Sequence, residues 1–263
     1  MQKSITFKNA TISFTDNGKG TAVVFLHGFL ENKKMWQDIR PHFSDRYRVI
    51  CIDLLGHGNS DCLGYVHSMD LFSDAVLAVL KALRLRKYFV IGHSLGGYVA
   101  LAIANKKATN IKGLCLMNST SNADSEERIK IRERANKMIR NNFENIIKIS
   151  VTNLFFQENL DKYKEQIEEV KKAALKTSLQ GYIAAQEGMK IRPNRNHVLI
   201  QNNFKKLIII GEKDPIINVE SVINEAQKTN ANYIVLEGGH MSHIENKDAL
   251  IDAFIKFLKP VKF

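Results

Sequence analysis

A chain of 263 residues with 44% hydrophobic and 25% charged residues has an ordinary globular composition, and its length allows one or two domains. The net charge of +11 would suit a nucleic-acid partner, but the basic residues are mixed with acidic ones, as in segment 125–137, and no nucleic-acid-binding motif occurs. The chain has no apolar run long enough to cross a membrane, no secretory signal and no CxxC pair among its three cysteines, so we expect a cytoplasmic protein without a disulfide framework or zinc site.

The first strand-like segment, residues 5–18, reads ITFKNATISFTDNG and alternates apolar with polar residues. Such alternation is typical of a strand with one buried face. Asp16, Asn17 and Gly18 are residue types that favour tight turns. We therefore predict an antiparallel hairpin at the edge of a sheet, with its turn at Asp16–Gly18.

Later segments contain short apolar runs rich in β-branched residues, which are typical of buried parallel strands. These segments are Thr21–Gly28, Tyr47–Gly56, Tyr88–Ser94, Ile111–Ser119, Lys205–Asp214 and Ala231–His240. Helical patterns lie between or after them, at Asp70–Leu85, Leu95–Lys107, Val219–Thr229 and Lys247–Leu258. The alternation of strand and helix predicts an α/β fold, a mostly parallel sheet with helices on both faces.

The alternation stops between residues 122 and 203. This region has helical periodicity and many charges, as in DKYKEQIEEVKKAALKTSLQGYIAAQEGM, but no strand-like run. We predict that residues 1–121 and 204–263 form the sheet domain, and that residues 122–203 are an all-helical insertion packed on it.

Ser94 stands in a G-x-S-x-G pattern, with Gly92 and Gly96 on either side and Gly97 next. A strand precedes it and a helix follows, which is the context of a nucleophile elbow. The small neighbours permit a strained turn that presents the serine hydroxyl above the sheet edge. The amide of Leu95, at the start of the helix, would point to the same space and is a candidate oxyanion donor.

A serine nucleophile needs a base and a group that orients the base. His240 follows a strand and two glycines in VLEGGHMSHIE, so it is the favoured base, with His243 as the rival. Asp214, which follows the strand LIIIG, is the candidate orienting acid. Asn118 ends the preceding strand but cannot supply a negative charge. The chain order Ser94, Asp214, His240 is that of α/β-hydrolases.

The second oxyanion donor should come from the loop after an earlier strand, which reads LHGFLEN. There, Gly28 allows the backbone to turn inward, and the amide of Phe29 is the candidate. With this loop in place, the chain resembles the α/β-hydrolase superfamily over nearly its whole length. The matching segments are His27–Phe29, Asp53–Ser60, Gly92–Gly97, Gly211–Ile216 and Gly238–Glu245.

The resemblance implies that the helical insertion is a cap over the site, and that Asp53 is a turn residue without a catalytic role. Two positions depart from family patterns. Lys247 stands where the family often has proline, at a helix start away from the chemistry. Tyr98 follows the elbow glycines where the related lyase of menaquinone synthesis, which shares the HGFL segment, typically has arginine.

We therefore expect a serine hydrolase that cleaves a small carboxylic ester, lactone or thioester through an acyl-enzyme, with no metal or cofactor. The partner is a small molecule, not a nucleic acid or a membrane, and the sequence does not predict an oligomeric state. Candidate pocket residues are Trp36, Tyr98, Met189 and Met241. A lyase on the same fold and a hydrolase-like ligand sensor remain alternatives, because function depends on the site more than on the fold.

Overall fold

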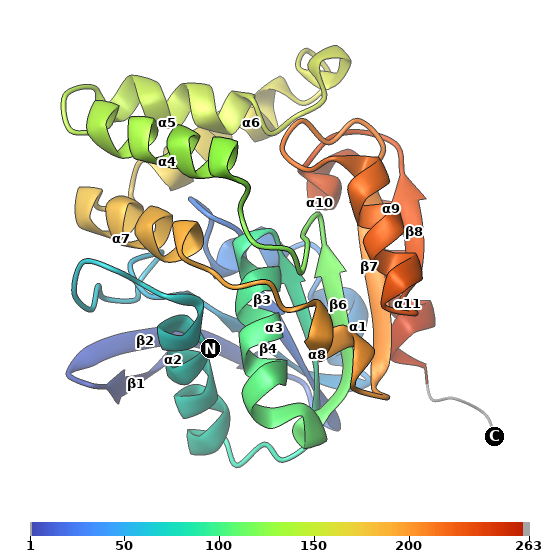
Figure 1. Ribbon diagram of the computed structural model, residues 1–263. Helices are drawn as coiled ribbons and strands as arrows, with labels where there is room; N and C mark the ends of the chain where they lie inside the picture. Colours follow the sequence, from blue (N-terminus) through green and yellow to red (C-terminus); the bar gives the residue numbers. More distant parts are fainter. Residues whose placement is uncertain (1, 260–263) are drawn as a thin grey trace.

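The computed structural model describes residues 2–259, and its strands form an eight-stranded sheet in the order β1-β2-β4-β3-β5-β6-β7-β8 (Figure 1). The strands span Gln2–Phe7 (β1), Ala10–Asn17 (β2), Thr21–Leu26 (β3), Tyr47–Ile52 (β4), Tyr88–His93 (β5), Ile111–Met117 (β6), Lys205–Gly211 (β7) and Asn232–Leu236 (β8). Strands β3 to β8 pair in parallel, and β2 pairs antiparallel with both β1 and β4. The predicted α/β fold with a mostly parallel sheet is confirmed.

The edge hairpin exists, but its predicted turn is wrong. β1 and β2 are joined at Lys8 and Asn9, which both have positive φ, 47° and 66°. Two such residues are typical of the tight turn that matches strand twist. Strand β2 continues through Asn17 because its second edge pairs with β4, and the turn at Gly18 leads onward to β3. The alternation of apolar and polar residues therefore continues past the turn at Lys8 and Asn9 and along β2.

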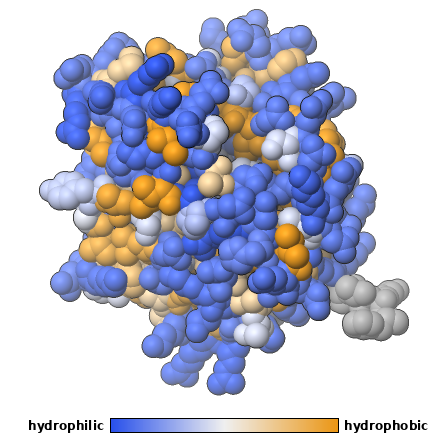
Figure 2. Space-filling model, viewed as in Figure 1, coloured by the Kyte–Doolittle hydropathy of each residue, from blue (hydrophilic) through white to orange (hydrophobic). Residues whose placement is uncertain are grey.

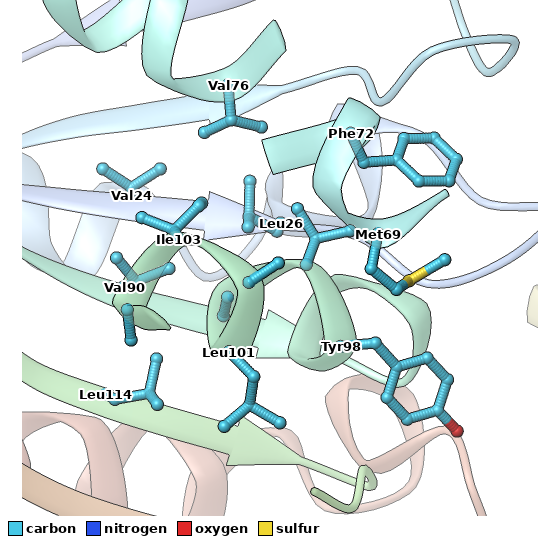
Figure 3. Close-up of a cluster of buried hydrophobic side chains, with 14 of the residues drawn as sticks. Val24, Leu26, Met69, Phe72, Val76, Val90, Tyr98, Leu101, Ile103 and Leu114 are labelled. Carbon is cyan, nitrogen blue, oxygen red and sulfur yellow. The ribbon is translucent and has the colours of Figure 1, made fainter. Parts of the chain in front are cut away.

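Helices cover both faces of the sheet, as expected. One face carries α2 (Met69–Ala82), α3 (Leu95–Lys107), α8 (Asn196–Ile200) and α9 (Val219–Lys228). The other carries α1 (Pro41–Ser44) and α11 (Lys247–Leu258). Successive strand residues point to opposite faces, so Val24 packs under α2 and α3 whereas Phe25 packs towards α11. Figure 3 shows the buried cluster around Val24, between the sheet and helices α2 and α3.

Residues 122–203 contain helices and no strand. Helices α4 (Glu126–Met138), α5 (Phe143–Thr152), α6 (Lys164–Ala174) and α7 (Leu179–Lys190) lie above the edge of the sheet where its parallel strands end (Figure 1). We call these four the cap helices. They share a buried cluster with Leu30 and Met241 of the sheet domain. Helix α8, by contrast, packs beside α3 on the sheet.

Hydrophilic residues dominate the face of the molecule shown in Figure 2, and hydrophobic residues gather there in separate patches. Within residues 2–259, no helix is both long and apolar enough to cross a membrane.

Candidate active site

Ser94 lies at the sharp turn between β5 and α3. Its backbone has φ 48° and ψ −113°, a conformation that residues with a side chain rarely adopt. The turn is held by its neighbours: the Ser94 amide donates to the Met117 carbonyl at 2.9 Å, and the Ser119 hydroxyl donates to the Ser94 carbonyl at 2.8 Å. A strained residue fixed in this way is typical of functional sites.

The flanking glycines are required by close backbone approach. A Cβ atom at Gly92 would lie 2.5 Å from the Gly97 nitrogen, and one at Gly96 would lie 2.7 Å from the His27 carbonyl oxygen. Neither clash could be relieved by a side-chain rotation, because the contacts are with backbone. The elbow therefore packs tightly against the loop that follows β3.

Asp214 and His240 are brought together as the sequence predicts. His240 Nδ1 lies 2.7 Å from Asp214 Oδ2, and both side chains are buried. Asp214 Oδ1 accepts the amides of Ile216 and Ile217, and Oδ2 also accepts from Asn118 Nδ2 at 3.0 Å. Burial would raise the pKa of Asp214, but the contact with His240 and these hydrogen bonds hold it below its ordinary value. Asp214 is therefore a fixed anion beside the imidazole.

The loop that carries His240 is bonded to the segment between the cap helices α5 and α6. The amide of His240 donates to the carbonyl of Leu154 at 2.8 Å. The carboxylate of Glu245, on the short helix α10 (Ser242–Glu245), accepts from the amide of Gly239 at 3.0 Å and from Asn159 Nδ2 at 2.8 Å. The position of His240 thus depends on both the sheet domain and the cap.

A buried ion pair that the sequence pattern did not predict lies directly behind these residues. Glu31 Oε2 accepts from the amide of Gly28 and contacts His93 Nδ1, both at 2.7 Å. His93 Nε2 lies 2.9 Å from the carbonyl oxygen of His240. Because both ring nitrogens face acceptors, both must donate, and His93 is an imidazolium. Burial would lower the pKa of His93 and raise that of Glu31, but their mutual attraction raises the first and lowers the second to about 2.

This ion pair links three parts of the site: the loop after β3, the elbow and the loop that carries His240. His93 lies in the matched segment Gly92–Gly97, and Glu31 lies in the loop LHGFLEN, two residues after the matched segment His27–Phe29. Their adjacency to the motif residues was the available signal. Their contact depends on neighbours that are distant in sequence.

A cavity of about 270 Å³ lies between the sheet edge and the cap helices. Both Ser94 and His240 line it. The other lining residues are Phe29, Leu30, His93, Tyr98, Arg128, Ile131, Arg132, Ala135, Ser150, Asn153, Leu154, Tyr182, Gln186, Met189 and Ile216. In the described part of the chain, no group of three or more His, Cys, Asp or Glu is placed to hold a metal ion.

Of the four predicted pocket residues, the structure brings Tyr98 and Met189 to the cavity and places Trp36 and Met241 elsewhere. Trp36 is fully buried on the face of the sheet that α1 and α11 cover, with its ring 4.9 Å from that of Phe25. Met241 is buried in the cluster shared with the cap helices. Both residues therefore pack in cores, because their apolar side chains fill space between elements.

His243, the rival base, has Glu31 as its acidic neighbour, whereas Asp214 contacts His240. Its Nε2 atom lies 3.6 Å from Glu31 Oε1, and burial lowers its pKa to about 4. It does not line the cavity. Its surroundings favour a neutral, structural side chain, which leaves His240 as the candidate base.

The two candidate oxyanion donors border the elbow and the cavity. Leu95 is the first residue of α3, where backbone amides have no partner within the helix. Phe29 lines the cavity. Its loop is held by His27, whose Nδ1 lies 2.7 Å from the Gly28 carbonyl while Nε2 accepts the Leu54 amide at 2.9 Å. The next residue, Leu30, has φ 64°, so the backbone turns sharply there.

Two arginines of α4, Arg128 and Arg132, also line the cavity and were not predicted as site residues. They stand four residues apart, which places them on one face of the helix. In the sequence, the same segment served only as an example of basic residues mixed with acidic ones, which argued against a nucleic-acid partner. The spacing of the two residues was the signal that could have found them.

The family to which this geometry belongs follows from comparison with known proteins. The model of the alpha/beta hydrolase fold family matches residues 21–247. The chain belongs to this family. Since the match runs from β3 to the start of α11, it includes strands β3 to β8, the cap helices and every residue of the candidate site.

Curated relatives match most of the chain. The "3-oxoadipate enol-lactonase 1" of Acinetobacter baylyi is 26% identical over 255 residues, which cover 96% of this chain and 94% of the relative. The "2-succinyl-6-hydroxy-2,4-cyclohexadiene-1-carboxylate synthase" of Shigella flexneri is 23% identical, with 90% and 93% covered. The chain is thus similar to proteins whose names describe different reactions.

Among solved structures, a thermophilic esterase from Thermogutta terrifontis, with malate bound, is 28% identical and has a TM-score of 0.91, with 98% of each chain covered. The enol-lactonase from Burkholderia xenovorans has a TM-score of 0.89 at 19% identity, covering 97% of this chain and 99% of that one. The second likeness shows the fold alone. The first likeness, to an esterase, identifies this chain as an esterase-like member of the alpha/beta hydrolase family.

Proposed function

We propose that this protein is a serine hydrolase that cleaves small carboxylic esters, lactones or thioesters through an acyl-enzyme at Ser94. The observation that carries the proposal is that a strained Ser94 and His240, which is bonded to Asp214, line the same cavity. The enol-lactonase relative and the esterase neighbour support an ester or lactone. Ligand pockets typically measure about 300–1,000 Å³, so the cavity suits a small substrate.

In the proposed reaction, Ser94 Oγ attacks the substrate carbonyl while His240 Nε2 takes the hydroxyl proton. Asp214 orients the imidazole through Nδ1 and stabilises its charged form. The amides of Phe29 and Leu95 bind the developing oxyanion. His240 then protonates the leaving group, and water repeats the sequence on the acyl-enzyme. Among residues 2–259, no hydrogen bond joins the Ser94 hydroxyl to His240, so the proposed proton transfer requires the hydroxyl to come within hydrogen-bond distance of Nε2.

The test is the Ser94→Ala variant assayed with short p-nitrophenyl esters. Loss of the nucleophile should lower the rate by about four to six orders of magnitude. The control is Ser221→Ala, the same change at an exposed position on α9, which should keep wild-type activity. Equal thermal midpoints would show that the Ser94 variant is folded. A folded Ser94→Ala protein with near-wild-type activity would refute the mechanism.

A lyase reaction is the second candidate, because the Shigella flexneri synthase covers most of the chain. Against it, the family arginine is replaced by Tyr98, whose ring is stacked under Arg192 with the guanidinium carbon 4.0 Å from the centroid. The two reactions differ in their use of water. Hydrolysis in ¹⁸O-labelled water places the label in the acid product, whereas elimination does not. A ligand sensor would show one slow turnover and no sustained rate.

A further inference from the structure

The charges around the cavity are unequally balanced. Arg128 and Arg132 line it, and no aspartate or glutamate is among its lining residues in the described part of the chain. His93, the other lining cation, is paired with Glu31, and a third arginine, Arg192, lies behind Tyr98. Positive charge with few compensating acids attracts an anion, and low-dielectric walls strengthen that attraction.

Among the residues that the structure describes, only one of these three guanidiniums lacks a carboxylate partner. Asp124 is bonded to both Arg132 and Arg192, and all three of these side chains are buried. Arg132 also donates to Gln186 Oε1 at 2.7 Å. These contacts fix Arg132 and neutralise part of its charge.

Arg128 has no such partner. Within residues 2–259, its guanidinium makes no ion pair or hydrogen bond to a side chain, and its backbone amide is capped by Ser125. It is half-buried, and burial and the charge of Arg132 lower its pKa. An arginine nevertheless stays protonated near neutral pH. Its donors therefore remain available on the cavity wall, near apolar neighbours such as Ile131 and Ala135.

We infer that the site selects esters or lactones that carry a carboxylate, and that the Arg128 guanidinium binds this carboxylate while Ser94 attacks the ester carbonyl. A planar guanidinium matches a carboxylate with two parallel hydrogen bonds. Since one small cavity holds both residues, the carboxylate and the scissile group belong to one small molecule. This inference rests on the proposed function, for which it names the substrate class.

A matched pair of substrates tests the charge preference. Monoethyl succinate and ethyl succinamate have nearly the same shape, but only the first carries a carboxylate. Ethanol release gives kcat/KM for each. We expect the wild type to favour the acid by about tenfold or more, and Arg128→Gln to reduce this ratio to near one, since a charge-assisted hydrogen bond typically gives about ten- to a hundredfold.

The control is Arg134→Gln, which removes the same charge from an exposed position of α4 outside the cavity and should keep the wild-type ratio. Raising the ionic strength should reduce the preference in the wild type. A wild type that hydrolyses both esters equally would overturn the inference, as would an equal loss of the ratio in both arginine variants. If ethyl succinamate is hydrolysed and this activity is lost in Ser94→Ala, the proposed function still stands.

A binding measurement covers the case in which neither ester is turned over. Calorimetric titration of the folded Ser94→Ala protein with succinate, and with succinamide as the neutral match, reports the anion site directly. We expect succinate to bind at least about tenfold more tightly than succinamide, and Arg128→Gln in the same background to lose this difference. Equal binding of the two compounds would overturn the inference.

Discussion

Replacing Glu31 by glutamine should destabilise the protein strongly, although the change keeps the shape of the side chain. The variant leaves the His93 imidazolium buried without its counter-ion. The pKa of Glu31 falls from 4.5 to about 2 in the folded protein. That shift corresponds to a contribution of about 3 kcal/mol to the free energy of unfolding, and removing one partner of a buried ion pair typically costs about 3–5 kcal/mol.

The pH dependence has a definite sign. A carboxylate with a lowered folded pKa stabilises the fold above its unfolded pKa, and this contribution is lost as the pH falls towards 2. His93, whose folded pKa is raised, contributes below 6.5 and loses that contribution as the pH rises through its folded value. The ion pair should therefore stabilise the protein most between about pH 4.5 and 6.5.

Urea unfolding of wild type and Glu31→Gln at about pH 5.5, and again at lower pH, measures the effect. Glu169→Gln, at an exposed position on α6, is the matched control and should change stability by less than about 0.5 kcal/mol. Adding His93→Gln to Glu31→Gln should cost less than the two single losses together. A loss below about 1 kcal/mol for Glu31→Gln, with no dependence on pH, would refute the assignment of a buried ion pair.

Two further outcomes are expected. Met189→Ala should shift the preference among p-nitrophenyl esters of graded acyl length by about ten- to a hundredfold, because a pocket methylene is worth about 1–3 kcal/mol; an unchanged profile with a lowered thermal midpoint would assign Met189 to packing alone. Burial lowers the pKa of His57 to about 3, so stability should fall as the pH drops from 6.5 towards 3, and less steeply in His57→Gln; identical slopes in urea unfolding would contradict this.

The predictable parts of the fold were those governed by local pattern. Buried parallel strands have β-branched runs, and an elbow requires glycines around its serine, so β3 to β8 and the position of Ser94 followed from the residues themselves. The hairpin turn did not, because alternation reports a half-buried strand and not the identity of its partner. Lys8 and Asn9 lacked the glycine that usually marks such a turn.

The candidate site was predictable only where a residue's place along a strand determines its role. Asp214 and His240 come at strand ends, and parallel strands bring those ends to one edge. The Glu31–His93 pair and the free charge of Arg128 depend on which side chains meet across the fold. Arg132 and Arg192 are paired because both contact Asp124, and no spacing in the sequence identifies the arginines that Asp124 contacts.

The bonds between the cap and the loop that carries His240 bear on how members of this family could exchange parts. Grafting foreign cap helices onto this sheet domain would replace the segment that places the Leu154 carbonyl against His240 and the Asn159 side chain against Glu245. A chimera joined at the ends of the insertion would thus have a new pocket but would hold His240, the proposed base, less firmly. A functional transplant would need to carry the segment from Leu154 to Asn159 and the loop from Gly239 to Glu245 together, as one inherited unit.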